Sequence, residues 1–359
     1  MNTADSSPLV TVAIPNYNTG NFIGEAIESA ILQTFTNLEI LVIDNASSDN
    51  SRQIIADWAL RDDRIIALNF DEHVSSLDNW NRCLKHARGQ YIVFLHADDR
   101  LKPKFLEAAL EVFSHRPDLG YVLAEMEYID ERGQIISKSQ FYNDSAIIPG
   151  LSEARVNIIG WHSVAVQMLI RTECMRSIGG YSYTDVMAVL QLNLGWDVGY
   201  LHTPLVQYRQ HQKSDTSQFI KDKTMIMTIY LTKMLILNYY LPPAGSHLKD
   251  LKRKVMEWAA KTCLKLYCMD VLGRNEKRLC EEYMALAKGF WLEVDRTPLY
   301  RFLEKALSEP SWTPQSLGKA WLEEQPATAA SAPPYPLPEG SEPFVPSGAM
   351  EGKPSVAFT

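Results

Sequence analysis

The chain has 359 residues and a formal net charge of −8, from 35 lysines and arginines against 43 aspartates and glutamates. With 46% hydrophobic and 22% charged residues, the composition is that of a soluble globular protein, and the length favours two domains. The acidic balance argues against a nucleic-acid partner, which usually requires a basic face.

Three features bear on the cellular compartment. The five cysteines include no Cys-x-x-Cys pair, so they support neither a disulfide framework nor a zinc site. Residues 1–8 are polar and lack the apolar core of an export signal. The longest apolar stretch, 225–241, carries Lys233 at its centre, which favours a buried or groove-lining helix over a membrane span. We therefore expect a cytoplasmic protein.

The N-terminal part of the chain alternates short apolar runs with helical patterns, as a parallel α/β layer does. The patterns predict strands at 10–14, 38–43, 65–68 and 91–95, and helices at 22–33, up to 59, 77–87 and after Pro103. Further along they predict a hairpin turn at 131–133, strands at 164–170, 198–201 and 205–208, and a helix at 184–194.

The C-terminal part is different in character. Long helical patterns cover 219–240, 248–272 and 276–292, and Gly273 is expected to end the second of these helices. Residues 311–359 hold nine of the 19 prolines, which predicts a mostly disordered tail. The expected organisation is an α/β domain at 1–216, a helical region at 217–310 and the tail at 311–359.

Polar residues follow the predicted strands at their carboxyl ends, where an open parallel sheet binds its ligands. The clusters are Pro15 to Asn18, Asp44 to Ser47, Trp80 with Asn81, and His96 to Asp99. The adjacent carboxylates of Asp98 and Asp99 repel each other unless a cation or hydrogen-bond donors compensate them. Mg²⁺ held between carboxylates and phosphate oxygens would do so; capping of the next helix is the alternative.

Two nucleotide-binding motifs are absent from the sequence. No G-x-G-x-x-G follows the first strand, and no G-x-x-x-x-G-K-[ST] occurs in the chain. A dinucleotide dehydrogenase and a P-loop NTPase are therefore both disfavoured. A phosphate-bearing ligand would be held through a metal and polar side chains.

Several segments resemble the inverting family 2 glycosyltransferases with the GT-A fold. They are VTVAIPNYN at 10–18, SAILQT at 29–34, EILVIDNASSD at 39–49, residues 79–95 followed by HADD, residues 178–185, and residues 198–211. The resemblance covers residues 8–216. It implies a Rossmann-like, mostly parallel sheet flanked by helices.

The resemblance assigns donor-binding residues position by position. Pro15 and Tyr17 match the first nucleotide-contacting loop, and Asp44 matches the acidic position that holds the base or ribose. Asn45 replaces a frequent second acid, and its amide oxygen can still accept a hydrogen bond from a base, so the identity of the base stays open. Asn81 matches a donor-pocket helix, where Trp80 is expected only to pack.

The metal and diphosphate motif matches Asp98 and Asp99. His96 stands where an acid often begins this motif; a ribose contact and a purely structural histidine are both open. His211 matches a further metal or diphosphate contact, and Arg209 would neutralise phosphate as a fork-shaped donor.

The acceptor side carries the expected base. Asp185 matches the family's catalytic base, and a base that deprotonates a sugar hydroxyl should be a carboxylate facing the metal's crevice. The alternative role is capping of the helix that follows, because aspartate is a favoured capping residue. His162 is expected to be a packed loop residue, with the acceptor pocket as its alternative.

The resemblance thus implies an inverting, metal-dependent transferase with Mg²⁺ or Mn²⁺ as cofactor and a nucleotide-diphospho-sugar as donor. The acceptor hydroxyl would belong to a saccharide, a lipid-linked saccharide or a protein, in cell-surface polysaccharide, glycolipid or glycoprotein synthesis. Peripheral association with the inner face of a membrane stays open. The alternatives are a non-catalytic nucleotide-sugar-binding module, suggested by Asn45 and His96, and a sugar-nucleotide pyrophosphorylase, whose glycine-rich basic loop is missing after the first strand.

Overall fold

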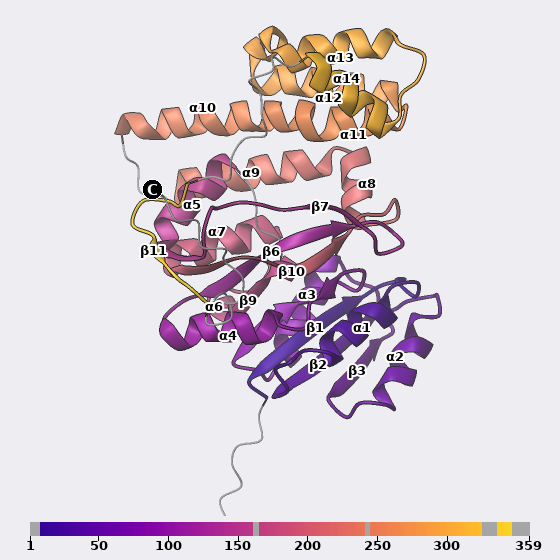
Figure 1. Cartoon of the computed structure of the whole chain (residues 1–359), viewed down its shortest axis with the longest axis vertical. Helices are drawn as coiled ribbons and strands as arrows, with labels where there is room; N and C mark the ends of the chain where they lie inside the picture. Colours follow the sequence, from indigo (N-terminus) through magenta and orange to yellow (C-terminus); the bar gives the residue numbers. More distant parts are fainter. Residues whose placement is uncertain (1–7, 161–164, 241–244, 325–335, 347–359) are drawn as a thin grey trace, which may run out of the picture. The chain divides into compact units, whose positions relative to one another are not determined.

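The computed structural model describes residues 8–160, 165–240, 245–324 and 336–346, and divides the chain into two compact units (Figure 1). Unit 1 comprises 1–157, 162–210 and 334–359 and contains the β-sheet. Unit 2 comprises 158–161 and 211–333 and is helical. The boundary at 210/211 lies close to the predicted one at 216/217.

The first half of unit 1 is the predicted parallel layer. Its strands are β1 (Val10–Asn16), β2 (Leu38–Asn45), β3 (Ile65–Phe70) and β4 (Tyr91–Phe94), in the order β4-β1-β2-β3. Its helices are α1 (Ile23–Ile31), α2 (Ser51–Ala59) and α3 (Ser76–His86). All residues of β2 and β4 are buried, as expected of strands covered on both faces. These elements confirm the predicted strands and helices to within a few residues.

The second half of the sheet is mixed. Its strands are β5 (Arg100–Leu101), β6 (Tyr121–Ile129), β7 (Ile135–Lys138), β8 (Ala146–Ile148), β9 (Met168–Arg171), β10 (Val198–Arg209) and β11 (Glu342–Pro343). β10 runs parallel to β6, while β9 is antiparallel to both β4 and β6. The sheet is therefore mixed where a mostly parallel one was expected. The two strands predicted over 198–208 are one strand, β10, with an irregular register around Pro204.

Helices cover both faces of this sheet. The remaining helices of this part of the chain are α4 (Phe105–His115), α5 (Gly150–Ile159), α6 (Thr172–Ser177) and α7 (Asp185–Gly195), with a 3₁₀ turn at Ala165–Gln167. Alternate residues of β1 enter different cores, because successive strand side chains point to opposite faces. Val12 and Ile14 belong to one buried cluster and Ala13 to the other. The predicted α/β class with helices flanking the sheet is confirmed.

Unit 2 is built from helices around its own core. They are α8 (Asp215–Lys221), α9 (Thr224–Tyr239), α10 (Gly245–Thr262), α11 (Met269–Gly273), α12 (Lys277–Phe290), α13 (Pro298–Ser308) and α14 (Pro314–Glu324), with a π-helical turn at Cys263–Cys268. The helix predicted over 219–240 divides at Lys223, whose φ of 64° is left-handed. Lys233 is buried, donates to the Gly160 carbonyl and lies 3.5 Å from the Trp258 ring centroid. No helix in the described ranges is long and apolar enough to cross a bilayer.

Parts of the predicted tail are ordered. Within 311–359, α14 packs Leu317 and Trp321 on the core of unit 2, and β11 pairs antiparallel with β8 in unit 1. Phe344 packs against one of the two buried clusters of unit 1 and meets the His115 ring edge-on. The prediction of disorder is therefore wrong for the described segments 311–324 and 336–346, where apolar side chains spaced between prolines find partners on the folded units.

Candidate active site

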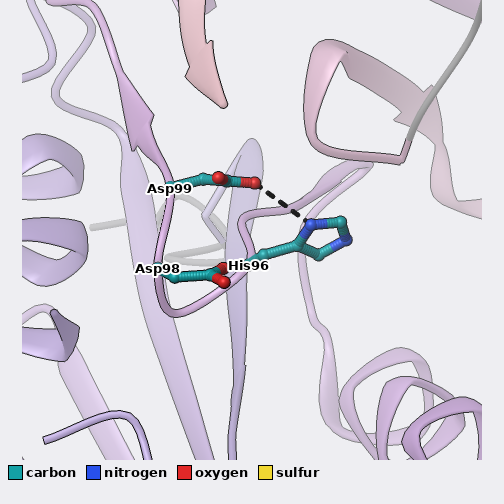
Figure 2. A group of neighbouring side chains, drawn as sticks. All are labelled: His96, Asp98 and Asp99. Carbon is teal, nitrogen blue, oxygen red and sulfur yellow. Dashed lines mark hydrogen bonds and ion pairs between the residues drawn. The ribbon is translucent and has the colours of Figure 1, made fainter. Parts of the chain in front are cut away.

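Three side chains converge in the turn that follows β4. The carboxylates of Asp98 and Asp99 point toward the ring of His96 (Figure 2), and one ligand atom from each residue lies within 4.8 Å of the others. His96 Nδ1 is 3.1 Å from Asp99 Oδ2. Asp99 is 1% exposed, whereas His96 and Asp98 are partly exposed. The two carboxylates are oxygen ligands of the kind that Mg²⁺ or Mn²⁺ takes.

Two observations separate a ligand site from a simple helix cap. The next helix, α4, has Lys104 at its N-cap and no side-chain capping bond, so neither aspartate caps it. The second ring nitrogen of His96, Nε2, is buried and has no hydrogen-bond partner among the described residues. An orphaned buried polar atom calls for a partner from outside the protein, such as a substrate hydroxyl or a cation.

The cluster concentrates negative charge. Burial and the charge of Asp98 raise the pKa of Asp99 to about 6, against the lowering effect of its hydrogen bonds with His96 and the Arg209 backbone N–H. Burial alone would lower the pKa of His96, but the hydrogen bond to Asp99 and the nearby carboxylate charges raise it. A cation bound here would relieve the repulsion between the two carboxylates.

Asp185 begins α7 and belongs to the same electrostatic environment. The N-cap of α7 is Thr184, whose hydroxyl accepts the Met187 N–H at 2.8 Å, so capping is not the role of Asp185. Asp185 Oδ1 accepts the Val186 N–H at 2.8 Å. Burial raises the pKa of Asp185, while this hydrogen bond and the charge of His96 lower it in part. A carboxylate with a raised pKa near the cluster is suited to accept a proton.

A stack of aromatic rings joins the two halves of the site. The rings of Trp80 and His96 lie 5.0 Å apart at 23°, and Tyr181 meets Trp80 edge-on at 4.8 Å. Asn81 donates to the Tyr181 carbonyl at 2.7 Å and accepts the Tyr181 N–H at 2.9 Å. Gly180, with φ of 74°, leaves room for this contact, since a Cβ there would lie 2.5 Å from Asn81 Oδ1. Asn81 therefore holds the turn before α7, and its amide is not free for the donor as expected.

Asp44 is fully buried at the end of β2. Its carboxylate accepts hydrogen bonds from Asn16 Nδ2 at 2.7 Å, the Ser47 N–H at 3.0 Å and Arg52 Nε at 2.7 Å. Burial raises its pKa, but these hydrogen bonds outweigh burial and the pKa is lowered. The sequence analysis placed Asn16 in the polar cluster after the first strand without assigning it a role, and it missed Arg52. The register of β1 on β2, which puts Asn16 opposite Asp44, is the signal that would have found Asn16.

Asn45 has a different role from the one predicted. Its Oδ1 accepts the Val74 N–H at 3.0 Å and Arg82 Nη1 at 3.0 Å, and its Nδ2 donates to the Val74 carbonyl at 2.8 Å. The side chain is buried and both ends of its amide are occupied. Asn45 therefore fixes the loop after β3. Its Oδ1 already accepts two hydrogen bonds, so the expected hydrogen bond from a base is not supported.

An exposed aromatic pair lies beside this loop. Tyr17, directly after β1, is 46% exposed, and its ring centroid is 4.2 Å from that of His73. His73, which the sequence reasoning missed, also approaches the Asn45 carbonyl with Nδ1 at 3.3 Å. Pro15 is the penultimate residue of β1 and leads into the loop. The pair offers a surface on which a planar base can stack.

Arg209 and His211 are the two residues near position 210 that were predicted to contact phosphate or a metal. Arg209, the last residue of β10, is buried, and its guanidinium donates to protein acceptors, so it cannot present a fork to phosphate as expected. His211 belongs to unit 2, and its metal-binding role stays a prediction. His162 lies outside the described residues.

Known proteins resemble the chain in sequence. Glycosyltransferase GlyG of Streptococcus pneumoniae serotype 4 is 30% identical over 125 residues, 35% of this chain and 41% of GlyG. The putative teichuronic acid biosynthesis glycosyltransferase TuaG of Bacillus subtilis is 32% identical over 109 residues, 30% of this chain and 43% of TuaG. The chain thus spans less than half the length of these two relatives.

Solved structures resemble the fold. S. aureus TarS 1–349 in complex with UDP-GlcNAc superposes with a TM-score of 0.59 at 18% identity, covering 83% of this chain and 90% of TarS 1–349. The mannosyltransferase PcManGT of Pyrobaculum calidifontis, in complex with GDP-Man and Mn²⁺, gives 0.51 at 17% identity, covering 89% of this chain and 88% of PcManGT. Both support the GT-A-like fold. Residues 11–178 match the family model for glycosyl transferase family 2, and this segment of the chain belongs to that family.

Proposed function

We propose that this protein is a cation-dependent inverting glycosyltransferase that moves a sugar from a nucleotide-diphospho-sugar to an acceptor hydroxyl. The observation that carries the proposal is the His96–Asp98–Asp99 cluster, to whose His96 ring Trp80 and Tyr181 connect the turn before Asp185. A proton acceptor and a diphosphate-anchoring site would then lie close to each other. The match to the family model supports the transfer itself. The inversion and the cation requirement are proposed in addition.

Each side chain has a defined role in the reaction. Asp98 and Asp99 would hold Mg²⁺ or Mn²⁺, which supplies neutralisation of the charge that develops on the leaving nucleoside diphosphate. Asp185 accepts the proton of the acceptor hydroxyl, whose oxygen attacks the anomeric carbon of the donor. The bond from that carbon to the diphosphate oxygen breaks, and the leaving group departs with the electron pair. In-line attack inverts the anomeric centre.

The proposed donor is a nucleotide sugar, because the loop after β1 offers a surface for a base. The Tyr17–His73 pair would stack on the base, and the buried Asp44 would order the loop beneath it. The similar structures carry UDP-GlcNAc and GDP-Man, which supports a nucleoside-diphospho-sugar and leaves the base open. The name of TuaG supports an acceptor in cell-surface polysaccharide synthesis, with lipid-linked and protein acceptors as the other classes.

Peripheral membrane association is also proposed, on the evidence of α9. Met227, Leu231, Leu235 and Tyr239 are exposed at every fourth position and form one apolar face. Sedimentation with vesicles of phosphatidylethanolamine and phosphatidylglycerol should retain the wild type and release Leu231→Ser. Leu322→Ser, at an exposed position of α14, is the matched control. Equal retention of both variants, or no retention of the wild type, contradicts this association.

The decisive test of function measures the products released from a donor. A thermal-shift screen of nucleoside diphosphates with Mn²⁺ first identifies the base, because a bound ligand stabilises the folded state. Release of nucleoside diphosphate from the matching sugar donor, lost with chelator, supports the transferase. Donor binding without release indicates a non-catalytic module. Pyrophosphate-dependent formation of nucleoside triphosphate indicates a pyrophosphorylase.

A further inference from the structure

Arg209 lies at the carboxyl end of β10 with its side chain fully buried. Arg209 Nε donates to the Asp98 carbonyl at 2.8 Å, and Nη1 donates to the carbonyls of Asp130 and Glu131 at 3.2 and 3.0 Å. Arg209 Nη2 lies 2.5 Å from Glu25 Oε2. The guanidinium therefore connects the turn after β4 with α1 and with the β6–β7 hairpin.

The main chain of Arg209 makes a second contact with the same turn. Its backbone N–H donates to Asp99 Oδ1 at 2.7 Å. One residue thus holds both members of the carboxylate pair, Asp98 through its carbonyl and Asp99 through its carboxylate. The Phe22 ring covers the guanidinium, with its centroid 4.8 Å from Cζ.

We infer that Arg209 is a positioning residue for the cation site, an inference that rests on the proposed function. The planar fork sets the backbone of Asp98, and that backbone sets the direction of both carboxylates. Lysine would keep the charge next to Glu25 but could not donate to three carbonyls in the plane of the fork. Groups that orient metal ligands without touching the metal typically change metal affinity by about 10- to 100-fold when they are replaced.

Arg171 provides a matched control. It is also the last residue of a strand, β9, its guanidinium donates to the carbonyls of Leu119 and Pro117, and it lies over the Tyr91 ring. Arg171 pairs with Tyr91 at the start of β4, whereas the carboxylate cluster follows the end of β4. Arg171→Lys therefore perturbs a similar anchor at the opposite end of the strand.

The test is titration of the full-length protein with Mn²⁺ alone, followed by the electron paramagnetic resonance signal of the free ion. We expect Arg209→Lys to weaken Mn²⁺ binding by at least about tenfold, and Arg171→Lys to bind like the wild type. Thermal unfolding of both variants is measured alongside, so that a general loss of stability is separated from a loss of affinity.

Two outcomes overturn different statements. Equal Mn²⁺ affinity of Arg209→Lys and wild type overturns the positioning role and leaves the proposed function intact. A wild type that binds no Mn²⁺ overturns the cation dependence and the inference together. If Arg209→Lys does not fold, Glu25→Gln is the second variant, because it removes the charge that anchors Nη2 and so loosens the guanidinium that holds the Asp98 carbonyl. It should weaken Mn²⁺ binding, and unchanged affinity overturns the inference.

Discussion

Thr184 caps helix α7 in place of Asp185: the Thr184 hydroxyl accepts the Met187 N–H, and the Asp185 carboxylate is turned to the neighbouring Val186 N–H. The helix is therefore capped by Thr184, and the Asp185 carboxylate is not needed as the cap. Asp185 is then a half-buried carboxylate whose pKa is raised by desolvation, with His96 as a charged neighbour. The arrangement leads to opposite expectations for stability and for catalysis.

Asp185→Asn should not destabilise the protein at neutral pH. Because burial raises the folded pKa of Asp185 above its ordinary value of 3.8, ionisation costs stability as the pH rises through and above that value. Asparagine removes this cost and still accepts the Val186 N–H. Chemical denaturation should show the variant at least as stable as the wild type at pH 7, with the difference vanishing below pH 3.8. Clear destabilisation at pH 7 would show that the charge of Asp185 stabilises the fold.

Asp44 should show the opposite pH dependence. Its folded pKa is lowered, so its contribution to stability is present above the ordinary value of 3.8 and is lost as the pH falls through the lower folded value. Asp44→Asn should lose about 2 kcal/mol at pH 7, and the loss should shrink on acidification. The control is Asp57→Asn on the exposed side of α2, which should unfold like the wild type. A loss that does not depend on pH would contradict this account of Asp44.

Asp99→Asn should remove the cation requirement of nucleotide binding together with most of the affinity. Asparagine keeps the shape and can still accept the Arg209 N–H, but it lacks the charge that a divalent cation needs. Calorimetry of nucleoside diphosphate with Mn²⁺ and with chelator measures both effects. Equal affinity of the wild type with and without chelator would remove the cation from the mechanism.

The ordered part of the C-terminal segment predicts a stability effect at Leu317. This side chain is 1% exposed in the core of unit 2, whereas Leu322 on the same helix is 68% exposed. Leu317→Ala should cost about 2–5 kcal/mol, and Leu322→Ala should lie within about 0.5 kcal/mol of the wild type. Equal stability of the two variants would show that α14 does not belong to the folded unit.

The sequence was sufficient for the parallel strands β1 to β4 and for the clusters at their ends. The largely apolar run 38–43 indicates a buried strand, and proximity in the chain places His96, Asp98 and Asp99 together. The hydrogen bonds by which Asn45 and Asn81 fix neighbouring loops could not be predicted, because their partners are backbone groups that are remote in sequence. Only the folded chain brings those groups within hydrogen-bond distance.

Glycines and prolines in the sequence indicated where elements end, but not the physical reason why the residue is found there. Gly273 was expected to end a helix, and α11 ends there, but the left-handed residue that follows is Asn275, with φ of 63°. A Cβ on Gly273 would lie 3.1 Å from the Cα of Pro314, so close packing of α14 explains the glycine. Among the described residues, Pro314 begins α14 and Pro343 ends β11, which composition alone cannot distinguish from disorder.

The central claim is that Asp185 is the base of a glycosyl transfer whose leaving group is held by Asp98 and Asp99. The most direct measurement is the transfer rate of Asp185→Asn beside its affinity for the donor identified by the thermal-shift screen. The account predicts a rate lower by about 10²- to 10⁴-fold with donor affinity nearly unchanged. Turnover near the wild-type rate, with the donor bound normally, would contradict it.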